Sequence, residues 1–225
     1  MCDGFWEVFS ALPSPKFQLQ VTTLSPVAVT DVSVNNTLKS QSAVKENPDP
    51  RNLYYLGREY NTHRSYRDCI ITLNKYLQHP SSTYREERMS ARLFLARSYI
   101  GCEQPEEAKQ QMILASIECP HRREPYLALA EQAYHSKNWV YGLAMVKELL
   151  ARNESNDAFT EPECNSYKPY DIGHCCAHYA GSKLESEAML DKALQLSMDN
   201  EAVFNRILNN AKIVSEELYN KYKRV

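Results

Sequence analysis

The sequence that decides the fold runs from Asn47 to Tyr60 and reads N-P-D-P-R-N-L-Y-Y-L-G-R-E-Y. Its third residue, Asp49, is suited to accept hydrogen bonds from the first backbone N–H groups of a helix, and Pro50 fits the first helical turn. Apolar, small and aromatic residues then share one helical face: Leu53, Leu56, Gly57 and Tyr60. Because a small residue lets a neighbouring helix come close, the stretch predicts the first helix of a tightly packed helix pair.

From Pro50 onward the chain is predicted to be helical to its end. Capping boxes are expected to open the second helix at Ser65, with Asp68, and the third at Thr83, with Glu86. The later helices are expected at 105–119, after the H-R-R-E-P turn at 121–125, and at 138–151, 167–181, 183–197 and 199–222. Residues 152–165 are polar and are predicted to form the longest loop.

Residues of the same kind recur in three successive helix pairs. A tetratricopeptide unit has about 34 residues, with an aliphatic residue at position 7, a small one at position 8, and small or apolar residues at positions 20, 24 and 27. Leu95 and Leu129 are 34 residues apart, and Leu56 and Leu95 are 39 apart. The residues at these positions are Leu56, Gly57, Cys69, Leu73 and Tyr76, then Leu95, Ala96, Ala108, Met112 and Ala115, then Leu129, Ala130, Gly142, Val146 and Leu149. Three units in register predict an all-α fold, a tetratricopeptide-like α-solenoid of antiparallel helix pairs.

Residues 1–46 differ from the rest of the chain. Apolar residues alternate at Phe17, Leu19 and Val21 and again at Val27 and Val29, a period typical of short strands. There are too few of them for an independent sheet. We therefore predict two parts: an irregular or strand-like arm or domain remnant at 1–46, and a helical-repeat domain at 47–225.

Composition excludes several classes of protein. The net charge is −2, which leaves no bulk positive field for nucleic acid. No apolar run approaches the roughly 18 residues of a membrane helix. The first residues lack a signal-peptide pattern, and the seven cysteines contain no C-x-x-C pair. We expect a protein of a reducing compartment, the cytoplasm.

Three blocks of the helical region resemble a known family. The run at 48–60, R-L-F-L-A-R-S-Y at 92–99 and R-R-E-P-Y-L-A-L-A-E at 122–131 are similar to the helical region that follows the catalytic domain in bacterial and phage family 2 glycosyltransferases. The resemblance covers about residues 45–210. It implies an accessory region of such an enzyme.

The family's catalytic motifs do not transfer onto this sequence. Its enzymes hold a divalent metal and the diphosphate with an Asp-x-Asp motif, and this sequence has none. Trp6-Glu7 only partly matches the tryptophan and His-Glu that close the family's catalytic domain. Two interpretations stay open: a non-catalytic binding module that positions a protein, a peptide or a glycan acceptor, and a truncated or diverged glycosyltransferase that needs a catalytic domain not present here.

Binding residues are expected on the inner face of the repeats. In a tetratricopeptide array, positions 2, 5, 9 and 12 of each first helix face the concave side. These positions give the expected partner-binding residues Arg51, Tyr54, Arg58, Asn61, Leu93, Arg97, Glu131 and Tyr134, together with Ser90, Ile100, Glu124 and Leu127. Arginines beside tyrosine suit a carboxylate or an extended acidic peptide. The alternative is that Arg58 and Arg97 pair with Glu131 or a neighbouring glutamate and hold the helices together.

Two further groups of residues are candidates for metal binding or for catalysis. His174 and His178 lie one helical turn apart and with Cys175 could share a zinc ion, whereas small residues here also suit a packed helix pair. We interpret this group as packing residues and surface histidines, and we expect no metal or cofactor. Cys119 lies two residues from His121, and we interpret this pair as part of a turn rather than as a catalytic dyad.

Overall fold

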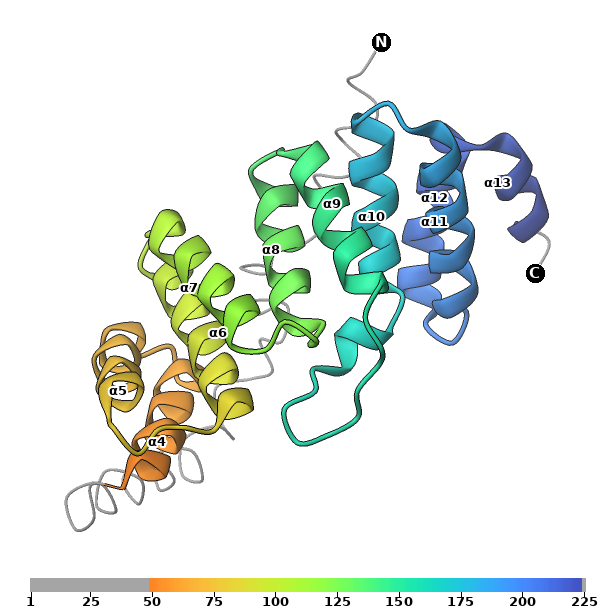
Figure 1. Cartoon of the computed structure of the whole chain (residues 1–225). Coiled ribbons are helices and arrows are strands. Elements are labelled where there is room, and N and C mark those ends of the chain that lie inside the picture. The colour runs from red at the N-terminus through yellow and green to blue at the C-terminus, as the bar shows by residue number, and fades with distance from the viewer. Residues whose placement is uncertain (1–48, 224–225) are drawn as a thin grey trace, which may run out of the picture. The chain divides into compact units, whose positions relative to one another are not determined.

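The computed structural model describes residues 49–223, and all its regular elements in this range are helices (Figure 1). The all-α class is therefore confirmed for this part of the chain, and the expectations for residues 1–46 lie outside the described residues. The elements are α4 (Pro50–Thr62), α5 (Tyr66–Gln78), α6 (Arg85–Gly101), α7 (Pro105–Glu118), α8 (Glu124–His135), α9 (Trp139–Leu150), the short 3₁₀ helix η1 (Pro162–Asn165), α10 (Lys168–Tyr179), α11 (Lys183–Leu196), α12 (Glu201–Val214) and α13 (Glu216–Tyr222).

The described residues divide into two compact units. The N-terminal unit consists of residues 49–128 and 156–159, and the C-terminal unit consists of residues 129–155 and 160–223. Helix α8 contributes residues to both units. The short segment 156–159 is part of the connection between α9 and η1, yet it belongs to the N-terminal unit.

In the N-terminal unit, α5 packs on α4, α6 packs on α5, and α7 packs on α6, and α4 also contacts α6. The two helices α4 and α5 approach closely at Gly57, where a Cβ atom would lie 2.3 Å from Cδ2 of Leu73 on α5. Ala96 has the equivalent place on α6 and is fully buried. The small residues at position 8 therefore lie where the sequence predicts a close contact between helices.

The repeat positions form the interior of both units. All of the residues that the sequence places at positions 7, 8, 20, 24 and 27 of the three units are buried. In the C-terminal unit, α10 packs against both α9 and α11. There, a Cβ at Gly173 would lie 2.5 Å from Sδ of Met189 and 2.9 Å from Cγ1 of Val146. Small residues thus set the helix spacing in each unit.

Neither predicted capping box is formed, and only the second of these two helix starts is displaced. Ser65 precedes α5 but its side chain makes no capping hydrogen bond, and α6 begins at Arg85 rather than at Thr83. The turn before α6 is instead held by Arg88, whose Nη1 donates to the carbonyl oxygens of Leu77 and Ser82, both at 3.1 Å. Two side-chain hydrogen bonds from Arg88 hold this turn, and the predicted local cap is not formed.

The predicted last helix is interrupted. Ser215 has an extended backbone (φ −157°, ψ 107°), which separates α12 from α13. Helix α13 packs against α11 and α12, and both Lys221 Nζ and Tyr222 Oη donate to Oδ1 of Asp191 on α11, at 2.7 and 2.9 Å. The break allows Tyr222 to be buried against α11, which a continuous helix would not permit.

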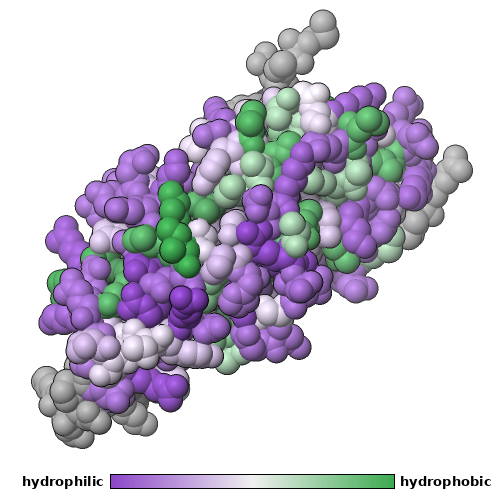
Figure 2. Space-filling view, in the orientation of Figure 1, coloured by the Kyte–Doolittle hydropathy of each residue, from purple (hydrophilic) through white to green (hydrophobic). Residues whose placement is uncertain are grey.

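No helix in the described range is both long and apolar enough to span a membrane. The longest, α6, has 17 residues and contains several charged side chains. The surface seen in Figure 2 is mostly hydrophilic, with hydrophobic side chains in separate small groups. Such scattered exposed apolar groups are ordinary on a protein surface.

Candidate functional site

The N-terminal unit carries a group of aromatic rings around Tyr54. We call five of its residues the aromatic cluster: Tyr54 and Tyr55 on α4, Tyr84 just before α6, Phe94 on α6, and Phe159; the Tyr76 ring on α5 lies 5.7 Å from Tyr54 beside it. The Tyr54 ring centroid lies 5.4 Å from Tyr55, 6.4 Å from Phe94 and 6.5 Å from Phe159. The Tyr84 and Phe159 rings meet edge to face at 5.6 Å. These separations are in the range in which aromatic pairs attract each other.

Two arginines lie over rings of this cluster at equivalent places in successive helix pairs. The guanidinium carbon of Arg58 is 5.1 Å from the Tyr55 ring centroid, and that of Arg97 is 5.4 Å from the Phe94 centroid. The two pairs are 39 residues apart, which is the spacing of the first two repeat units. Both arginines are exposed, and Arg58 Nη2 also lies 3.8 Å from Oε1 of Glu59. A ring beneath a guanidinium orients its plane without using its N–H donors.

Other residues predicted on the inner face join α4 to α6. The hydroxyl groups of Tyr54 and Ser90 are 3.0 Å apart, and burial raises the pKa of Tyr54. Asn61 Nδ2 donates to Ser98 Oγ at 2.9 Å and to the Phe94 carbonyl at 3.2 Å. These side chains therefore position the aromatic cluster from within the unit.

The remaining predicted residues of α4 and α6 have mixed environments. Leu93 is buried in the core. Arg51 is exposed, and its Nε lies 3.7 Å from Oε2 of Glu87, a buried carboxylate that also accepts a hydrogen bond from Tyr76 Oη at 2.8 Å. Arg51 thus lies at the solvent end of a buried polar contact.

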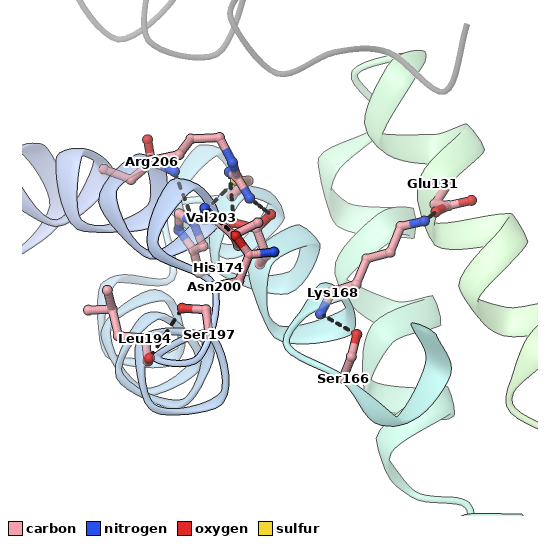
Figure 3. A network of polar contacts seen from close by, with 12 residues as sticks. Glu131, Ser166, Lys168, His174, Leu194, Ser197, Asn200, Val203 and Arg206 are labelled. Atoms are coloured by element: carbon pink, nitrogen blue, oxygen red, sulfur yellow. Dashed lines mark hydrogen bonds and ion pairs between the residues drawn. The ribbon is translucent and has the colours of Figure 1, made fainter. Parts of the chain in front are cut away.

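Glu131 and Tyr134 lie in the C-terminal unit, unlike the predicted residues on α4 and α6. Lys168 Nζ is 2.5 Å from Oε1 of Glu131 (Figure 3). Burial raises the pKa of Tyr134. The structure thus divides the eight predicted binding residues between the two units, and Glu131 has a lysine of its own unit as a partner.

Sequence reasoning missed one segment of the site. Residues 156–159 were expected only as polar loop, yet Phe159 packs against two core groups of the N-terminal unit, one that contains Tyr54 and one that contains Leu93. Asp157 forms an ion pair with Arg122, whose side chain is 2% exposed. The available signal was that Phe159 is the only aromatic residue in 152–165.

The C-terminal unit contains a buried polar network around His174 (Figure 3). Arg206 on α12 donates to both carboxylate oxygens of Asp171 on α10, at 2.8 and 3.3 Å. The Nε2 atom of His174 lies 3.5 Å from Asp171 Oδ1, 3.4 Å from Cys175 Sγ and 3.5 Å from Asn210 Nδ2. The network connects α10 to α12.

Asp171, His174 and Cys175 also have the chemistry of metal ligands, and their ligand atoms all lie within 4.8 Å of one another. The sequence had suggested His178 as a ligand in place of Asp171. However, the charge of Asp171 is already balanced by Arg206, and a bound cation would lie close to that guanidinium. We therefore interpret the group as a structural network rather than as a metal centre.

Protonation states agree with a structural role. Burial raises the pKa of Asp171, but the hydrogen bond from His174 and the charge of Arg206 lower it by more, so the net pKa is below the usual value. Burial and then the charge of Asp171 raise the pKa of the Cys175 thiol. The carboxylate is charged and the thiol is protonated at neutral pH.

The candidate catalytic nucleophile, Cys119, is buried, and burial raises the pKa of its thiol to about 11. Its neighbour His121 is exposed. A protonated, buried thiol is a poor nucleophile. The geometry agrees with our interpretation of this pair as part of a turn.

No protein-family model matches the sequence, and no curated protein is significantly similar to it. The resemblance to family 2 glycosyltransferases therefore stays a prediction from the three sequence blocks. Any assignment of function depends on the geometry of the aromatic cluster and its two arginines.

Proposed function

We propose that the chain is a non-catalytic, tetratricopeptide-like helical-repeat module that binds an extended acidic peptide. The binding groups are Arg58 and Arg97 at the rim of the aromatic cluster. The observation that carries the proposal is the repeated aromatic–arginine pair, with Arg58 over Tyr55 and Arg97 over Phe94.

The pairing favours recognition of carboxylates. A guanidinium offers a planar fork of N–H donors that fits a carboxylate, and a ring beneath it lowers the conformational entropy lost on binding. Helices α4 and α6 contact each other directly, so both arginines belong to one packed surface. A segment with two or more carboxylates and an aromatic side chain would match this surface in both charge and shape.

A role in glycosyl transfer is supported only by the sequence resemblance. The resemblance to the helical region of family 2 glycosyltransferases supports an accessory role in which the module positions a partner or acceptor for glycosyl transfer. Within the described residues, the candidates for catalytic chemistry are a buried protonated thiol and an ion-paired carboxylate. Neither supports a reaction at the aromatic cluster.

The test uses a fluorescein-labelled peptide, Glu-Ser-Glu-Phe-Ser-Glu, whose binding is measured by fluorescence anisotropy. We expect the Arg58→Ala, Arg97→Ala double variant to bind it about tenfold or more weakly, because hydrogen bonds to charged groups contribute about 1.5–3 kcal/mol each and exposure reduces this. Binding to the unchanged chain should also weaken as salt is raised.

The matched control removes two positive charges elsewhere. Arg67 and Lys75 are exposed on α5, and the Arg67→Ala, Lys75→Ala variant should bind like the unchanged chain. A lysine version of the peptide should not bind. Equal loss in both double variants would show that only net charge matters, and unchanged binding after removal of Arg58 and Arg97 would reject the site.

A further inference from the structure

The segment 156–159 makes two specific contacts with the N-terminal unit. Phe159 is half-buried and packs edge to face on Tyr84 and against Tyr54. It also contacts the core group of Met89, Leu93, Ala115 and Cys119. One aromatic side chain from a non-helical segment therefore lies against side chains that belong to two core groups and completes the aromatic cluster.

The second contact is electrostatic. Asp157 Oδ2 accepts a hydrogen bond from Nη1 of Arg122. The guanidinium of Arg122 is held in place by Glu124, through Nε at 3.0 Å and Nη2 at 2.8 Å. The arginine side chain is 2% exposed, whereas that of Asp157 is 51% exposed. A buried, oriented guanidinium thus presents one donor to a carboxylate that approaches from solvent.

The segment itself is shaped for these contacts. The Oδ1 atom of Asp157 accepts a hydrogen bond from the backbone N–H of Phe159 at 2.9 Å. This Asx-type turn fixes the carboxylate relative to the ring two residues later. A short non-helical segment with an acid at one position and an aromatic ring two positions on can therefore make both contacts.

We propose that Asp157–Phe159 is an intramolecular occupant of the binding surface, and that the external ligand is an extended peptide of the same pattern, an acidic residue two positions before an aromatic one. The proposal rests on the proposed function in that both concern the aromatic cluster. It adds two binding positions: Arg122 binds the acidic residue, and the position next to Tyr54 and Tyr84 binds the aromatic ring. It also adds that the chain's own segment Asp157–Phe159 competes with the external peptide for these positions.

The size of the competition depends on the fraction of molecules in which the segment occupies the site. A tethered segment acts at an effective concentration in the millimolar range, and the apparent affinity for an external ligand falls by the fraction of molecules whose site is open. If the segment occupies the site in about nine molecules of ten, then its removal raises the apparent affinity about tenfold.

The experiment uses a fluorescein-labelled peptide that copies residues 153–161, N-E-S-N-D-A-F-T-E. Its binding to the unchanged chain and to the Phe159→Ala variant is measured by fluorescence anisotropy. We expect the variant to bind the peptide at least about tenfold more tightly. A peptide in which the aspartate and the phenylalanine are both alanine should bind neither chain.

Two further variants keep the result interpretable. Asp157→Asn retains Phe159 and weakens the contact with Arg122, so it should also bind the peptide more tightly than the unchanged chain. Asn156→Ala alters an exposed side chain of the same segment and should bind like the unchanged chain. Thermal unfolding of each variant establishes that it is folded. Equal peptide binding by the unchanged, Phe159→Ala and Asp157→Asn chains, or no binding by any of them, would overturn the proposal.

The two proposals fail in different ways. If Phe159→Ala binds the copied peptide tightly and the further loss of Arg58 and Arg97 changes nothing, then the intramolecular occupant stands and the arginine site of the proposed function is rejected. If the Glu-Ser-Glu-Phe-Ser-Glu peptide binds through the two arginines but Phe159→Ala and Asp157→Asn have no effect on either peptide, then the proposed function stands and the intramolecular occupant is rejected.

Discussion

At Gly57 a single methyl group would meet the side chain of Leu73, so the spacing of α4 and α5 depends on one missing carbon atom. Ala96 has the same place in the second helix pair, where α6 packs on α7. By the repeat register, Met112 corresponds to Leu73. Leucine and methionine have nearly the same volume, so the two helix pairs fill this matching core position with side chains of similar size.

Replacement of Ala96 by leucine should therefore overpack the contact between α6 and α7. We expect a loss of about 1–3 kcal/mol in the free energy of unfolding, because a well-packed interior has no room for three more carbon atoms. Urea denaturation followed by circular dichroism measures the loss. The control is Ala144→Leu, at an exposed position of α9, which should change stability by no more than about 0.5 kcal/mol. Equal stability of Ala96→Leu and the unchanged chain would show that the repeat register is wrong.

At the scale of elements, charged side chains join one helix to another, both between consecutive helices and between helices that are not consecutive. Arg88 and Arg92 on α6 both bond Glu118 on α7, with distances of 2.9 and 3.1 Å to the same carboxylate oxygen. Burial raises the pKa of Glu118, but the hydrogen bonds and charges of these two arginines lower it by more. In the C-terminal unit, Arg206 and Asp171 join α12 to α10 in the same way.

The Asp171 contact predicts how stability depends on pH. Because the pKa of Asp171 is lowered on folding, its stabilising contribution is present above the pKa of the unfolded chain, about 4, and is lost as the pH falls through the lower folded value. Asp171→Asn should cost roughly 2–3 kcal/mol at pH 7, less than a fully buried pair because Arg206 is 21% exposed. The difference from the unchanged chain should shrink as the pH falls below about 4.

Urea denaturation between pH 7 and about pH 2 measures this dependence, because the loss is expected between the unfolded pKa and the lower folded pKa. Asp199 is exposed and lies between α11 and α12, so Asp199→Asn is the matched control and should leave the pH profile unchanged. A stability difference for Asp171→Asn that stays constant over this pH range would contradict an ionic role for the carboxylate.

At the scale of the whole molecule, the described residues form two helical units, and the proposed binding groups lie in the N-terminal one. The overall charge of −2 leaves the arginines of the aromatic cluster as a local feature rather than part of a basic surface. Recognition by such a surface depends on the placement of a few cations, not on a long-range field.

The helices between residues 50 and 222 make up more than half of the 225 residues. We therefore expect the far-ultraviolet circular dichroism spectrum of the purified chain to show more than half helix. The proposed repeat architecture consists of helix pairs stabilised by packing, so the helical signal should disappear in a cooperative thermal transition. A helical content well below half would contradict the fold.

The sequence alone determined the helical class, the approximate extent of most helices and the buried positions in the three helix pairs of the predicted repeat. This was possible because helix period and repeat spacing are local properties, carried by residues three, four and about 34 positions apart. The exposed aromatic–arginine pairs follow the same register, so Arg58 and Arg97 could be proposed from the sequence. Their positions over Tyr55 and Phe94 could not, since that depends on side-chain conformation.

The tertiary structure decided the rest of the candidate site. Arg122 with Asp157 and Asp171 with Arg206 are each 35 residues apart in sequence and share no periodic pattern. Three other features likewise depend on which segments the packed helices bring together: the place of Phe159 beside Tyr54, the break at Ser215 and the buried network of His174. A single charged or aromatic residue in a polar stretch gives no local signal of its partner, because the contact stabilises only the assembled fold.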